Sequence, residues 1–180
     1  MVSKFGAGDG LCVRADAVLR SLVARDHEVH AFTQSRHVQL LPEERIHRFR
    51  AVQLNPHFSL DVVHAPGMIA RESQRHGIDV LHAQMNSGST DFLLPFFKRA
   101  LPPLVVTYHL AYAGSDSLVG TVFDIATKAS LFAGKRYDAV ILVHPLHKRM
   151  FLESGFPEEK LHVIVNGVDT HRFCPAPTRR

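Results

Sequence analysis

The sequence predicts an α/β fold, in which helices cover both faces of a parallel sheet, and two observations support this. Residues 138–143 (Asp-Ala-Val-Ile-Leu-Val) form a continuous apolar run, which is typical of a parallel strand buried on both faces. The chain also opens with a strand, a glycine-rich turn, a helix and a second strand, which is how a βαβ unit begins. Its 180 residues, 46% of them hydrophobic, favour one folded domain with a single core.

Composition excludes several classes of protein. The formal net charge of +4 permits attraction to phosphates or to an anionic membrane surface, so peripheral membrane contact stays open. Lysines and arginines are scattered and do not alternate with aromatic residues, so we expect no nucleic-acid partner. No apolar run is long enough to span a membrane, and Cys12 and Cys174 form no motif. We therefore expect a cytoplasmic protein without a signal peptide.

The first elements follow from apolar periodicity and glycine placement. We expect a strand ending at residues 2–5, a glycine-rich turn at 6–10, a helix over 13–25 and a strand over 28–33. The turn matches the first half of a nucleotide-binding fingerprint through Gly6 and Gly8. However, the third glycine position is Leu11, and no acidic residue ends the second strand. A dinucleotide-binding domain and a plain tight turn both remain alternatives.

The middle of the chain alternates strands and helices. We expect a loop over 34–44, a short strand over 46–54, and a helix over 60–76 that is interrupted near Pro66-Gly67. A strand over 77–84, a helix over 90–100, a strand over 102–109 and an amphipathic helix over 118–135 follow. Open parallel sheets bind ligands beyond the carboxyl ends of their strands. The polar residues at two such ends are candidates for a binding site: His82, Gln84, Asn86, Ser87 and His109.

The last elements are the most clearly marked. Pro145 can open a helix, in which Leu146, Met150 and Phe151 recur at helical spacing. Gly155 and Pro157 end that helix, and residues 161–165 form the next strand. Asn166-Gly167 then turns the chain.

This last stretch resembles the end of the N-terminal domain in GT-B glycosyltransferases of family 4. The matching residues are Lys148, Phe151, Gly155, Pro157, Lys160, Val163, Ile164, Asn166, Gly167, Val168, Asp169, Phe173 and Pro175, in order and without a gap. Residues 77–84 and Thr107-Tyr108-His109 resemble two further strand ends of that family. Departures occur at Asp9 and Asp26, where the family usually has glycine, at Gln84 in place of histidine, and at His144 in place of serine.

The resemblance implies a Rossmann-like domain over residues 1–175, the N-terminal half of a GT-B fold, with an interdomain linker beginning at 176–180. It implies metal-independent transfer of a hexose-type sugar, with retention, from a nucleotide-diphosphate sugar to the hydroxyl of a glycan, lipid or small molecule. The donor would sit mostly on a C-terminal domain that these residues do not include, so we expect the chain alone to be inactive. A non-catalytic partner subunit of a split enzyme is the alternative.

The resemblance also assigns roles to individual residues. It implies that His109 is catalytic and faces the cleft. The donor phosphates would lie near the loop Gly8, Asp9 and Gly10, and the cleft side of the hinge would be Asn166, Gly167 and Asp169. The acceptor would contact His82, Gln84, Asn86 and Ser87. We expect no cofactor and no metal, because the histidine pairs 27/30 and 144/147 have no third ligand nearby in sequence.

Overall fold

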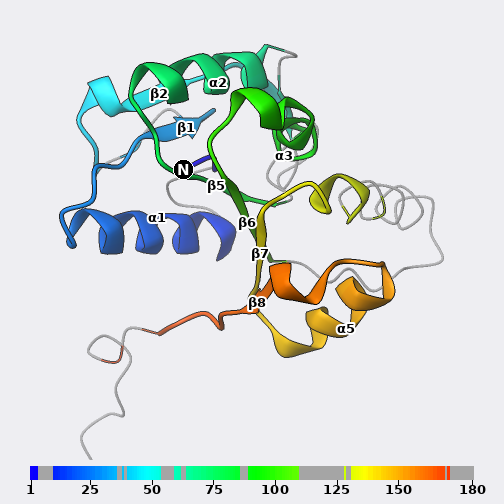
Figure 1. The fold of residues 1–180 in the computed structure, drawn as a ribbon. Helices are drawn as coiled ribbons and strands as arrows, with labels where there is room; N and C mark the ends of the chain where they lie inside the picture. The colour runs from blue at the N-terminus through cyan, green and yellow to red at the C-terminus, as the bar shows by residue number, and fades with distance from the viewer. Residues whose placement is uncertain are drawn as a thin grey trace, which may run out of the picture.

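The structure, a computed structural model, describes residues 1–3, 10–35, 38, 40–53, 59–61, 64–85, 89–109, 128, 131–168 and 170. Figure 1 shows their arrangement. The α-helices are α1 (Gly10–Val23), α2 (Ala65–Arg75), α3 (Thr90–Leu93) and α5 (Pro145–Glu153). The strands are β1 (Ala31–Thr33), β2 (Ile46–Arg48), β3 (Ala51–Gln53), β4 (Ser59–Asp61), β5 (Leu81–Gln84), β6 (Leu104–Tyr108), β7 (Ala139–Leu142) and β8 (Leu161–Val163). Short 3₁₀ helices are η1 (Glu43–Arg45), η2 (Leu94–Ala100) and η3 (Glu158–Lys160).

The main sheet is parallel, as the sequence predicts. Strands β5, β6, β7 and β8 pair in that order, and β1 pairs with β2. Val2 lies between the two groups, because it forms parallel bridges to Phe32 of β1 and to Ala83 of β5. Its N–H donates to the carbonyl of His82 at 2.8 Å, and its carbonyl accepts from the N–H of Gln84 at 3.1 Å. Residues 1–3 therefore join the groups into one sheet through bridges at Val2, at the place expected for the end of a first strand, whereas residues 4 and 5 of that expected strand lie outside the described residues.

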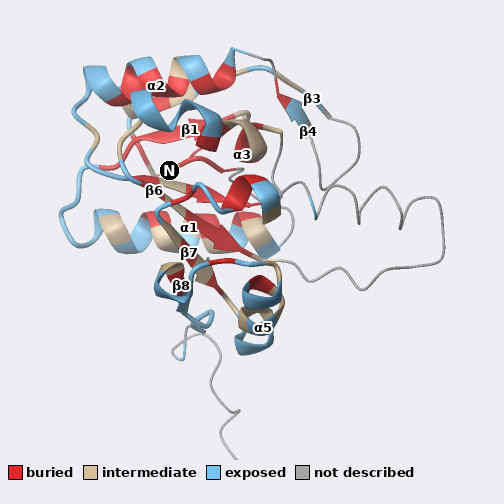
Figure 2. Cartoon of the chain, turned by 45° about the vertical axis from the view of Figure 1, so that its right-hand side comes forward, coloured by how far each residue is buried: buried red, intermediate tan, exposed pale blue. Residues whose placement is uncertain are grey.

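Helices cover both faces of this sheet, which confirms the predicted fold class. On one face, Val2, Phe32 and Ala83 pack in a cluster with Ile69 of α2. On the other face, Ala31 and Leu19 of α1 belong to a second cluster. Figures 1 and 2 show β1 between α2 and α1, and Figure 2 shows the buried residues concentrated in the strands and on the facing sides of the helices.

Two predicted elements are divided differently in the structure. The expected strand over 46–54 is two strands, of which β2 joins the parallel sheet and β3 pairs antiparallel with β4. The expected helix over 60–76 is shorter, because β4 occupies its beginning and α2 starts at Ala65. Pro66 lies in the first turn of α2, where the N–H that proline lacks would have no partner. It therefore opens the helix and does not interrupt it.

Burial of β7 differs from the prediction. The apolar run 138–143 suggested a strand buried on both faces, but only Val140 and Leu142 are fully buried. Ala139 and Ile141, on the alternate side, are partly exposed. Burial therefore alternates along β7, which lies between β6 and the three-residue β8.

The residues predicted to begin and end α5 do so. His144 precedes the helix, and its Nδ1 accepts a hydrogen bond from the N–H of Leu146 at 3.2 Å. This is the capping role that serine commonly plays, which accounts physically for a histidine at this position. Gly155 follows the helix with φ of +76°, a left-handed conformation that favours glycine. Asp26, at a position where the family usually has glycine, also has a positive φ of +60°.

No helix among the described residues is long and apolar enough to cross a membrane.

The packing of α5 against the core leads to a first testable prediction. Phe151 is fully buried, and its ring lies 4.9 Å from that of Tyr108 and 4.7 Å from that of Phe156. Phe151→Ala should reduce the free energy of unfolding by about 3–5 kcal/mol, because it leaves a cavity among these rings. Urea denaturation measures the change. Leu146→Ala in the same helix is the control, since Leu146 is 77% exposed and its loss should cost less than about 0.5 kcal/mol. Equal effects of the two substitutions would contradict this packing.

Candidate functional site

Polar side chains from two neighbouring strands meet at the carboxyl edge of the sheet. Leu81 and Ala83 of β5 point into the core on the α2 side, so His82 and Gln84 point to the opposite face. Thr107 of β6 stands beside Gln84 in the strand register, and His109 directly follows β6. The sequence reasoning that placed His82, Gln84 and His109 at one edge therefore agrees with the geometry.

These four side chains form one continuous hydrogen-bonded chain. His82 Nε2 lies 2.8 Å from Thr107 Oγ1 and 3.3 Å from Gln84 Nε2. The other end of the Gln84 amide, Oε1, lies 2.5 Å from His109 Nε2. Gln84 and Thr107 are completely buried, whereas the two histidines are partly exposed. We call this set of four residues the polar chain.

The chemistry of the amide fixes the direction of each hydrogen bond. Gln84 Nε2 can only donate, so His82 Nε2 must accept, and the Thr107 hydroxyl can donate to the same nitrogen. Gln84 Oε1 can only accept, so His109 Nε2 carries a hydrogen. All directions agree when His82 is neutral and its proton is on Nδ1. A protonated His82 would carry a hydrogen on Nε2, and that N–H would point at the N–H of Gln84 Nε2.

The surroundings keep His82 in that neutral state. Burial lowers the pKa of His82 to about 4, and repulsion from Arg14, and from the Met1 amino group and His109 when these are protonated, adds to this effect. At neutral pH the ring is therefore an acceptor within the polar chain.

Arg14 is a candidate site residue that the sequence reasoning missed. It lies one turn into α1, after Gly10, which is the exposed first residue of that helix. Its Nε is buried and has no hydrogen-bond partner among the described residues. Burial lowers the pKa of the guanidinium, which nevertheless stays charged at neutral pH. A cationic side chain beside a helix N-terminus suits an anionic ligand. A basic residue one turn after a glycine-rich loop was the available signal.

Of the remaining predicted site residues, only some lie in the described part of the chain. Asn166 and Gly167 are exposed and follow β8, and no contact described for them reaches the polar chain. Gly8, Asp9, Asn86, Ser87 and Asp169 lie outside the described residues.

A second cluster lies elsewhere and was not predicted. The sequence offers only pairs of histidines, and we expected no metal site. In the structure, His30, His47 and His76 meet from three separate elements at the opposite end of the strands. The residues are 17 and 29 positions apart in sequence, so no local motif marks them.

Comparison with known proteins agrees with this architecture. Residues 8–172 match the model of the family described as Glycosyltransferase Family 4. A glycosyltransferase from Rickettsia africae has a similar structure, with a TM-score of 0.59 and 18% identity over 94% of this chain. This chain spans 43% of that protein's length. A sucrose-phosphate synthase structure from Thermosynechococcus elongatus is similar at a TM-score of 0.58 and 14% identity, covering 93% of this chain and 88% of that one. No curated protein sequence matches significantly.

The buried His82 of the polar chain leads to a prediction of how the free energy of unfolding depends on pH. The pKa of His82 is about 4 in the folded chain and about 6.5 in an unfolded one, so the unfolded chain binds more protons between these pH values. Stability should therefore fall as the pH decreases from about 6.5 to 4, by roughly 3 kcal/mol from this residue. His82→Asn removes the titration, so urea unfolding across this pH range should show a shallower pH dependence in the variant. Identical slopes would show that His82 is not buried as described.

Proposed function

Because this chain belongs to glycosyltransferase family 4, we propose that it forms the acceptor-side half of the cleft in an enzyme that transfers a hexose from a nucleotide-diphosphate sugar to an acceptor hydroxyl. The observation that carries the proposal is the polar chain, which presents His109 at the carboxyl edge of the sheet. Ligands of open parallel sheets bind at that edge. The reaction retains configuration at the transferred carbon and needs no metal.

His109 is the proposed catalytic residue. Its Nε2–H is held by Gln84, so its Nδ1 can accept a hydrogen bond from a hydroxyl of the sugar or of the acceptor. The acceptor would lie along the same edge, against the partly exposed His82, while the buried Gln84 would act from behind by holding both histidines in place. Asn86 and Ser87 follow after Met85 in the sequence and complete the proposed acceptor contacts.

Arg14 and the start of α1 are proposed to face the donor phosphates. As the sugar leaves the nucleotide, the diphosphate gains negative charge, and a fixed cation near that charge lowers the barrier. The guanidinium of Arg14 and the N-terminal end of α1 supply positive potential, and the preceding Gly8, Asp9 and Gly10 form the proposed phosphate loop.

A second domain must supply the rest of the cleft. Transfer requires donor and acceptor to be held together, and the residues of this domain form one wall. We propose that the donor nucleotide binds mainly to a C-terminal Rossmann-like domain, joined through the hinge at Asn166, Gly167 and Asp169. That domain can be on the same polypeptide or on a partner subunit.

The proposed function is tested by reconstitution. The chain is assayed alone and after fusion to the C-terminal half of the Rickettsia glycosyltransferase, with UDP-glucose, UDP-N-acetylglucosamine and GDP-mannose as donors. Nucleoside diphosphate release in the presence of mixed glycan and lipid acceptors measures turnover. We expect release only when both halves are present. Turnover by the chain alone would overturn the division of roles, and no turnover with any donor in the fusion would count against a catalytic cleft.

The role of His109 makes a separate prediction. In a fusion that turns over, His109→Ala should lower kcat by about 10²-fold or more, because a hydrogen-bonding group at the reacting atoms is lost. Unfolding stability should fall by about 1–3 kcal/mol, because the buried Gln84 Oε1 loses its hydrogen-bond donor. His162→Ala is the matched control, because His162 is exposed on β8. Unchanged kcat in His109→Ala would remove His109 from the catalytic site.

A further inference from the structure

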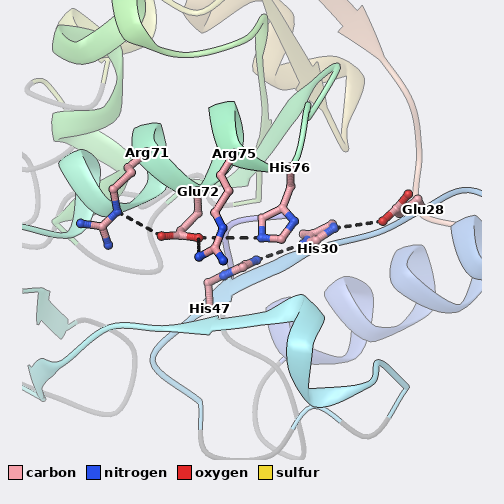
Figure 3. A network of polar contacts seen from close by, with 7 residues as sticks. All are labelled: Glu28, His30, His47, Arg71, Glu72, Arg75 and His76. Atoms are coloured by element: carbon pink, nitrogen blue, oxygen red, sulfur yellow. Dashed lines mark hydrogen bonds and ion pairs between the residues drawn. The ribbon is translucent and has the colours of Figure 1, made fainter.

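Three histidine rings meet at the amino ends of the strands, away from the polar chain. His30 directly precedes β1, His47 lies in β2, and His76 caps the C-terminal end of α2. One ring nitrogen from each lies within 4.8 Å of the other two. Figure 3 shows the three rings side by side, with Glu28 at one end and Glu72 at the other. We call this set of three residues the histidine cluster.

The fold brings these rings together through strand register and helix placement. His47 pairs with Phe32 across the parallel strands β1 and β2, and its ring stacks on the Phe32 ring at 4.8 Å. His30 is two residues before Phe32, so both side chains point to the face that α2 covers. The end of α2 carries His76 to the same place, 4.5 Å from the His30 ring and 5.2 Å from the His47 ring.

The nitrogen positions suit a metal ion with tetrahedral coordination. His30 Nδ1 and His47 Nε2 share a hydrogen bond at 2.9 Å, which a bound metal ion would replace, and all three candidate nitrogens lie within 4.8 Å. Zinc bound to histidine at about 2.0–2.1 Å places two ligand nitrogens about 3.3 Å apart. This separation lies between the two observed distances, 2.9 and 4.8 Å. Small rotations of the exposed His76 ring would therefore bring its nitrogen to ligand distance.

Two carboxylates lie next to the histidine rings. His30 Nε2, which faces away from His47, contacts Glu28 Oε1 at 3.3 Å. Glu72 Oε2 lies 3.8 Å from His76 Nε2. A carboxylate behind a ligating histidine fixes the orientation of its ring and strengthens it as a ligand. Nearby arginines are paired with these carboxylates: Arg45 with Glu28 at 3.8 Å, and Arg71 and Arg75 with Glu72 at 3.1 and 3.7 Å.

We propose that His30, His47 and His76 bind a divalent transition metal ion, with zinc as the best fit, and that a water molecule takes the fourth position. Imidazole ligands select zinc, nickel or copper over magnesium and calcium, which prefer oxygen. The site opens to solvent at His76. Bound metal would tie β1, β2 and the end of α2 together, on the edge of the sheet that the sugar-transfer reaction does not use.

The experiment measures zinc binding to the full chain. The protein is purified with a histidine-free tag, stripped with EDTA, and titrated with zinc chloride at neutral pH by isothermal titration calorimetry. We expect one ion per chain, a rise in the thermal unfolding midpoint when zinc is present, and no binding of magnesium chloride. Cobalt chloride should give the intense visible absorption of tetrahedral coordination. Absence of zinc binding at micromolar concentrations would overturn the proposal.

Matched variants assign the binding to the histidine cluster. His76→Asn removes an exposed ligand and should weaken zinc binding at least tenfold, with an unchanged unfolding midpoint in EDTA. Glu28→Gln should weaken binding by about 10–100-fold, because the carboxylate behind His30 is lost. His162→Asn is the control and should bind zinc as the unmodified chain does. The pair His144 and His147 is intact in every variant. Equal zinc affinity in His76→Asn and in the control would also overturn the proposal.

Discussion

Residues 1–3 hold the sheet together. Their backbone pairs with β1 on one side, where Phe32 N–H donates to the Met1 carbonyl at 2.7 Å, and with β5 on the other through Val2. Because parallel pairing fixes which side chain faces which helix, this short segment sets the register between the β1–β2 pair and the four-strand group that begins with β5. The bridge to Val2 aligns Ala83 with residues 1–3. Because side chains alternate along β5, this bridge also fixes the face to which His82 and Gln84 point. The Met1 amino group itself donates to the carbonyl of His30 at 2.6 Å.

The same alternation divides the sheet into faces of different character. On the α2 face the central strands are apolar, with Leu81, Ala83 and Val106 fully buried. On the α1 face, β5 and β6 carry His82, Gln84 and Thr107 at positions that are largely shielded from water. Burying such groups is unfavourable unless their hydrogen bonds are made inside the protein. The polar chain meets that requirement, which is why a polar stripe is compatible with a stable centre of the sheet.

Much of the fold was predictable because its signals are local. The apolar run before His144, the proline and glycine that bound α5, and the spacing of Phe151 identify β7, α5 and their order. The gathering of His82, Gln84 and His109 was predictable as well, since the carboxyl ends of parallel strands share one edge. The resemblance led us to expect glycine at position 26. The backbone of Asp26 has the left-handed conformation that favours glycine, which agrees with that expectation.

Contacts between distant elements could not be predicted. The histidine cluster depends on the pairing of β1 with β2 and on the length of α2, and neither is written in a local pattern. The position of Arg14 relative to His82 likewise depends on how α1 packs across the sheet. The division of residues 46–61 into β2, β3 and β4 escaped the prediction because strands of three residues show little periodicity.

The buried amide of Gln84 has a consequence for the energetics of binding. With no exposed surface and both ends engaged, this amide has a single orientation, and it therefore selects one tautomer and one ring orientation of His109. The entropy lost in orienting the ring is incurred when the chain folds. If the proposed acceptor hydroxyl binds at this edge of the sheet, it would meet a ring that is already preorganised, and little of its binding energy would be consumed in aligning the protein.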